Sequence, residues 1–153
     1  MKRNSVVFLQ TVVILIGICT LAFMLWEPQI EGRNAHATLL AIYFQDPFLT
    51  YIYISSLPFF LALYQTIKIL GHIGRNNIFT QENSKALQTV KYCALTIIGL
   101  AMVGEIFIKL GHSDDRAGGV AMGLFVIFFS VIVATLADVF AAILQSAIHK
   151  IKQ

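Results

Sequence analysis

Four long apolar stretches, almost free of charged side chains, constrain this chain more than any other feature. They cover residues 6–26, 48–70, 92–108 and 118–144, and the last three carry one charge each, Lys68, Glu105 and Asp138. A helix needs about 20 apolar residues to cross the hydrocarbon core of a bilayer. We therefore predict an all-α membrane protein, a single four-helix transmembrane domain over residues 1–153. An inner loop over 71–91 and outer loops over 27–47 and 109–117 join the spans.

Composition supports this class and excludes others. The 153 residues are 58% hydrophobic and 12% charged, whereas soluble domains are about 45–50% apolar and about 25% charged. A soluble enzyme, a disordered regulator and a classical DNA-binding domain are excluded. The sequence lacks the common hydrolase, metalloprotease and nucleotide-binding motifs, and Cys19 and Cys93 stand alone in apolar runs. We expect no enzymatic activity, no cofactor, no metal site and no direct nucleic-acid binding.

The basic residues predict the orientation, because cytoplasmic loops carry an excess of Lys and Arg. With both termini inside, eight basic residues face the cytoplasm and three face outward. The eight are Lys2, Arg3, Lys68, Arg75, Lys85, Lys91, Lys150 and Lys152, and the three are Arg33, Lys109 and Arg116. We predict that both termini are cytoplasmic and that the inner face attracts anionic membrane lipid.

Charged residues inside the spans are candidates for function, because their burial in lipid is costly. Asp138 and Lys68 should lie at similar depth near the inner boundary, together with Gln10 and Tyr64. We predict an Asp138–Lys68 pair in a polar layer of these four residues, serving as a structural clasp, a proton or cation site, or a ligand-sensing site. Nearer the outside, Glu105 precedes Lys109 by four residues, which favours an ion pair within one helix.

Local signals add detail at the helix ends and interfaces. Thr80 suits an N-cap and Glu82 a first turn, which predicts one helix from about residue 81 to about 109. The glycines at 119 and 123 permit close helix approach. A row of small and polar residues predicts either packing within the four-helix bundle or a homo-oligomer contact. The row is Ser130, Ala134, Asp138 and Ala142.

A family resemblance rests on two segments of the sequence. SLPFFLALYQTIKILGHIGRNNIFTQENSKALQTVKYCAL, and the last span with its flanks from SDDRAGG to the C-terminus, resemble the family of small four-span bacterial membrane proteins known as domain of unknown function 2975. The resemblance implies the fold and a bacterial cytoplasmic membrane location, without an activity. It also implies a gene often placed beside a small helix-turn-helix regulator. Family members often end in an acidic stretch, whereas this sequence ends in Ile-Lys-Gln.

These observations predict a regulatory or interaction protein that binds a cytoplasmic partner through its inner loop. The expected contact surface consists of Arg75, Asn77, Phe79, Thr80, Glu82, Asn83 and Lys85. One alternative is a small ion-coupled transporter or exporter that uses Asp138. Another is an immunity or stress-resistance protein that faces outward through residues 27–46 and 112–116.

Overall fold

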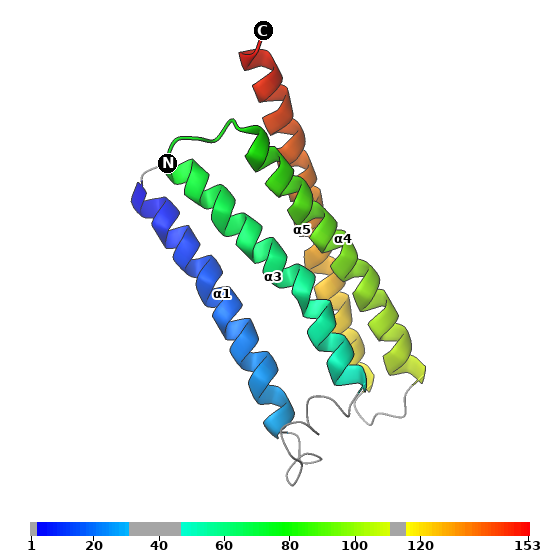
Figure 1. The fold of residues 1–153 in the computed structure, drawn as a ribbon. Coiled ribbons are helices and arrows are strands. Elements are labelled where there is room, and N and C mark those ends of the chain that lie inside the picture. The colour runs from blue at the N-terminus through cyan, green and yellow to red at the C-terminus, as the bar shows by residue number, and fades with distance from the viewer. Residues whose placement is uncertain (1–2, 31–46, 111–115) are drawn as a thin grey trace.

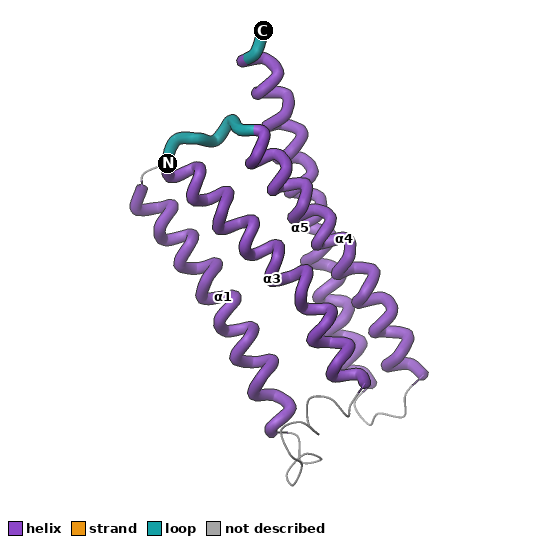
Figure 2. Tube along the Cα trace, in the orientation of Figure 1, coloured by secondary structure: helices purple, strands orange, loops and turns teal. Residues whose placement is uncertain are grey.

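The computed structural model describes residues 3–30, 47–110 and 116–153, and every regular element in these ranges is a helix (Figures 1 and 2). The helices are α1 (Arg3–Ile30), α3 (Pro47–Gly74), α4 (Gln81–Leu110) and α5 (Arg116–Ile151). All four contain a segment long and apolar enough to cross a membrane. The predicted all-α class with four candidate membrane spans is confirmed.

The helix starts follow local sequence signals. Thr80 precedes α4, and its Oγ1 accepts a hydrogen bond from the backbone N–H of Asn83 at 3.3 Å. The helix then runs from Gln81 to Leu110, which confirms the predicted start and length. Pro47 opens α3, where its missing N–H removes no helical bond.

The helices pack mainly against their neighbours in the chain. α1 lies against α3, α3 against α4, and α4 against α5 (Figure 1). Two polar contacts join α1 to α3: Gln10 Nε2 donates to the carbonyl of Ile67 at 3.2 Å, and Tyr53 Oη donates to that of Met24 at 2.6 Å. Among the described helices, α1 makes no extensive contact with α4 or α5. The described helices therefore pack one after another in chain order, rather than forming the closed four-helix bundle that we expected.

α4 and α5 pack along a seam to which α5 contributes mostly small side chains. The buried positions of α5 are separated alternately by four and three residues, which is the 3.5-residue period of a coiled coil. They are Ser130, Ala134, Ala137, Ala141, Leu144 and Ile148. The seam corrects the predicted row, because Asp138 and Ala142 lie beside it and are exposed.

Outside these interfaces the helices expose large apolar side chains. More than half of the surface of several phenylalanines is accessible, including Phe8, Phe23, Phe125, Phe128 and Phe129. In water, each Å² of exposed apolar surface would cost about 25 cal/mol of free energy. Lipid removes that cost, so the exposed faces of this fold are those of a membrane protein.

Candidate functional site

The connection between α3 and α4, residues 75–80, lies at the end of the molecule where α1 begins and α5 ends (Figure 1). We call this end the loop end. α3 stops there in a Schellman motif: Asn76 takes a left-handed φ of 57°. The N–H of Asn76 donates to the carbonyl of Ile73 at 3.1 Å, and that of Asn77 donates to His72 at 2.9 Å. Asn tolerates this conformation better than most side chains, so the sequence Arg-Asn-Asn sets the turn.

Asn83 holds the loop against the two helices. Its side-chain Nδ2 donates to the carbonyls of Asn77 and Ile78, both at 2.9 Å, while its Oδ1 lies 2.5 Å from Nδ1 of His72. Since both Nδ2 hydrogens are used on carbonyls, Oδ1 is the acceptor and Nδ1 of His72 carries the proton. Only 2% of Asn83 is exposed. We call this set of bonds the Asn83 clasp, and it joins the end of α3, the loop and the start of α4.

The clasp turns other loop side chains outward. Arg75, Asn77, Ile78 and Phe79 are all exposed, and Phe79 is 57% exposed. They form a basic and apolar surface on a backbone fixed by hydrogen bonds, called the loop surface below. Such a surface can bind a partner with little loss of conformational entropy.

The structure divides the predicted contact residues into two groups. Arg75, Asn77 and Phe79 belong to the loop surface, and Glu82 and Lys85 are exposed on the first turns of α4. Asn83 is buried, and the Thr80 hydroxyl caps α4. The burial of Asn83 contradicts its predicted place on the contact surface, because its polar groups close the loop. Thr80 instead fills the N-cap role that the sequence also predicted for it.

The predicted Asp138–Lys68 pair does not form. Lys68 Nζ lies 2.6 Å from Glu82, and Lys91 Nζ lies 2.7 Å from Asp138. The reason is the helix order: α4 lies between α3 and α5, so it supplies both opposite charges. The Asp138 side chain is 60% exposed.

The predicted polar layer is therefore not assembled. Gln10 reaches a carbonyl of α3 at the level of Ile67, next to Lys68 in sequence, but Tyr64 is 62% exposed. No described contact links either residue to Asp138. The layer was inferred from depth alone, and depth does not specify which helices are neighbours.

The predicted Glu105–Lys109 ion pair within α4 does not form either. Glu105 turns toward α5, where one carboxylate oxygen touches the position that a Cβ of Gly123 would occupy. That oxygen is buried and has no hydrogen-bond partner, and no ion pair joins Glu105 to Lys109. The absence of a side chain at Gly123 leaves room for this orientation.

Sequence reasoning missed His72 and gave Lys91 only a role in orientation. A signal existed for His72, since a histidine in the last turn of a helix often bonds to nearby polar groups. Nothing local in the sequence paired Lys91 with Asp138. In the described residues no three His, Cys, Asp or Glu side chains gather as metal ligands, and the outer segments 31–46 and 111–115 lie outside those residues.

Sequence comparisons place the chain in a family. Residues 31–153 match the protein family described as Protein of unknown function (DUF2975). The chain belongs to this family. It is 34% identical over 150 residues to the Uncharacterized membrane protein YoaS of Bacillus subtilis (strain 168), covering 97% of this chain and 94% of the relative. No solved structure matches the chain. The family match includes α3, α4, α5 and the whole Asn83 clasp.

Proposed function

We propose that this DUF2975 member is a non-enzymatic regulatory protein of the bacterial cytoplasmic membrane that binds a cytoplasmic protein through the loop surface. The observation that carries the proposal is the exposed Phe79 on a loop fixed by the buried Asn83. A side chain of this kind in water costs free energy, and a partner that covers it recovers that cost. Aromatic and Arg side chains also supply much of the binding energy in protein interfaces.

The orientation is part of the proposal. The start of α1, the loop surface and the end of α5 share the loop end (Figure 1), and eight of the eleven basic residues belong to the same side by sequence. The excess of Lys and Arg supports a cytoplasmic location for that side. Both termini and the loop surface would then face soluble cytoplasmic proteins.

The length of the last two helices supports a surface that stands clear of the lipid. At 1.5 Å per residue, the 36 residues of α5 extend about 54 Å, well beyond a hydrocarbon core of about 30 Å. Leu144 and Ile148, near its end, are still buried, and α5 packs extensively against α4. A paired support of this kind would present the loop surface at a fixed height.

The partner class that we propose first is a small helix-turn-helix regulator, because the family resemblance implies such a neighbour gene. Binding at the membrane would hold the regulator away from DNA, and this protein itself would not contact nucleic acid. The basic loop surface favours an acidic segment on the partner.

The transport alternative loses its main support at Asp138. A coupling carboxylate is expected to face the protein interior or a water-filled path, whereas Asp138 is exposed beside the α4–α5 seam and paired with Lys91. The outward-facing alternative concerns residues 27–46 and 112–116, most of which lie outside the described ranges.

In-membrane photo-crosslinking in the native host tests the proposal. A photo-reactive residue replaces Phe79, and a second strain carries it at Ile151, an apolar side chain of comparable exposure at the same end. Mass spectrometry then identifies the captured molecules. We expect a specific cytoplasmic protein from Phe79 and not from Ile151. Capture of lipid alone, or of the same set of proteins from both positions, would contradict the proposal.

A further inference from the structure

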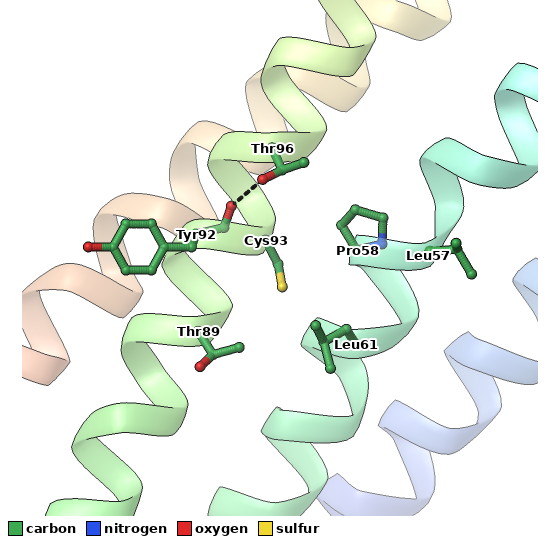
Figure 3. Close-up of a pocket in the computed structure, with 7 residues that line it drawn as sticks. All are labelled: Leu57, Pro58, Leu61, Thr89, Tyr92, Cys93 and Thr96. Carbon is green, nitrogen blue, oxygen red and sulfur yellow. Dashed lines mark hydrogen bonds between the residues drawn. The ribbon is translucent and has the colours of Figure 1, made fainter.

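A groove of about 540 Å³ lies between α3 and α4, about halfway along both helices (Figure 3). Seven residues line it: Leu57, Pro58 and Leu61 from α3, and Thr89, Tyr92, Cys93 and Thr96 from α4. Several of them are exposed, so the groove is open on a face that lipid would cover if these helices span the membrane. It shares no lining residue with the loop surface.

The walls of the groove are mostly apolar, although two threonines line it. The hydroxyl of Thr89 donates to the carbonyl of Lys85 at 3.0 Å, and that of Thr96 donates to Tyr92 at 2.9 Å. Both hydroxyls are thus satisfied within α4 and leave their methyl groups for contact. On α3, Pro58 presents a ring and no N–H. The groove suits a flexible hydrocarbon chain better than a polar ligand.

The end of the groove nearer the loop is charged. Lys68 follows Leu61 by seven residues on α3, and Lys85 precedes Thr89 by four residues on α4. Each lysine therefore lies on the same helix face as its groove residue and nearer the loop end. Lys68 is paired with Glu82 across the two helices. Lys85 is exposed and has no ion-pair partner among the described residues. One uncompensated ammonium group therefore lies at the loop end of the groove, the end that the orientation proposed above places toward the membrane surface.

The distance from Lys85 to the far end of the groove matches the thickness of one leaflet of a bilayer. At about 1.5 Å per residue, Thr96 lies about 16 Å along α4 from Lys85, and half of a hydrocarbon core is about 15 Å. A phosphate at Lys85 would therefore place an acyl chain along the full length of the groove.

We propose that the α3–α4 groove is a binding site for one anionic phospholipid, with an acyl chain between Leu61 and Tyr92 and its phosphate at Lys85. The charge of Lys85 selects an anionic headgroup, and the groove holds the chain. The site is independent of the protein partner proposed above, because it uses the lipid-facing side of the same helix pair.

Native mass spectrometry of the purified full chain tests the site with two lipids of identical acyl chains, phosphatidylglycerol and phosphatidylcholine. Lys85→Gln removes the charge, with Lys150→Gln on α5 as its control. Leu61→Trp fills the groove, with Leu95→Trp as its control, because Leu61 and Leu95 have nearly equal exposure, 45% and 46%. Circular dichroism checks that each variant keeps its helix content.

We expect one phosphatidylglycerol to be retained in preference to phosphatidylcholine. Lys85→Gln should weaken phosphatidylglycerol binding about fivefold, the contribution of one basic residue at an anionic surface, and Leu61→Trp should weaken both lipids. Equal retention of the two lipids by the unaltered chain, or equal effects of each variant and its control, would overturn the proposal. A protein dimer that Leu61→Trp disrupts without changing lipid retention would assign the groove to a second copy.

Discussion

Replacement of Asn83 by alanine should release the 75–80 loop while leaving the helices in place. The substitution removes two hydrogen bonds to the carbonyls of Asn77 and Ile78 and the acceptor of His72. Each neutral bond contributes about 1 kcal/mol net. Water can reach part of the exposed loop, so we expect the free energy of loop opening to fall by about 2–3 kcal/mol.

Hydrogen exchange of the loop amides measures this change. The N–H of Asn77, bonded to the carbonyl of His72 at 2.9 Å, should exchange about 30–150-fold faster, since 1.4 kcal/mol corresponds to a factor of ten. Gln81→Ala is the control, because Gln81 is exposed in the first turn of the same helix. Asn83→Asp should act at least as strongly, because it places a carboxylate oxygen against two carbonyls. A change below about threefold, less than one hydrogen bond, or an equal change in the control, would refute the clasp.

Three further predictions concern the helix interfaces. Lys91→Asp should reduce resistance to unfolding by dodecyl sulfate, because it breaks the ion pair with Asp138. Adding Asp138→Lys, which exchanges the two charges, should restore that resistance; a double variant no more resistant than the single one would exclude the pair. Gly119→Leu should destabilise the packing of α5 on α4 by about 1–3 kcal/mol, because even a Cβ would lie 3.1 Å from Ile108; an unchanged melting temperature in detergent would contradict this contact. Tyr53→Phe should cost about 0.5–1 kcal/mol by removing the bond from α3 to α1; full retention of stability in an unfolding titration would argue against it.

The helices and their ends could be predicted because their causes are local. An apolar stretch of about 20 residues must be helical in lipid to satisfy its backbone, and Thr80 and Pro47 carry helix-start preferences. The extra turns of α4 beyond its apolar stretch followed from the same cap. Each of these inferences needed only a window of neighbouring residues.

The partners of the charged residues could not be predicted because their causes are tertiary. Lys68 and Asp138 were matched by depth, but a depth estimate says nothing about helix order, and α4 separates the two helices. The carboxylate of Glu105 turns toward Gly123 because a glycine lies on the facing helix. Asn83 looked like a surface residue because three of the groups that it bonds to lie five to eleven positions away.

The most direct test of the central claim combines the clasp with the crosslinking position. The photo-reactive residue is placed at Phe79 in three backgrounds: the unaltered chain, Asn83→Ala and Gln81→Ala, with equal membrane levels of each protein. If the clasp presents a partner-binding surface, the crosslinked partner is retained in the unaltered and Gln81→Ala backgrounds and strongly reduced in Asn83→Ala. Equal yields in all three backgrounds would contradict the claim that an ordered loop is the contact surface.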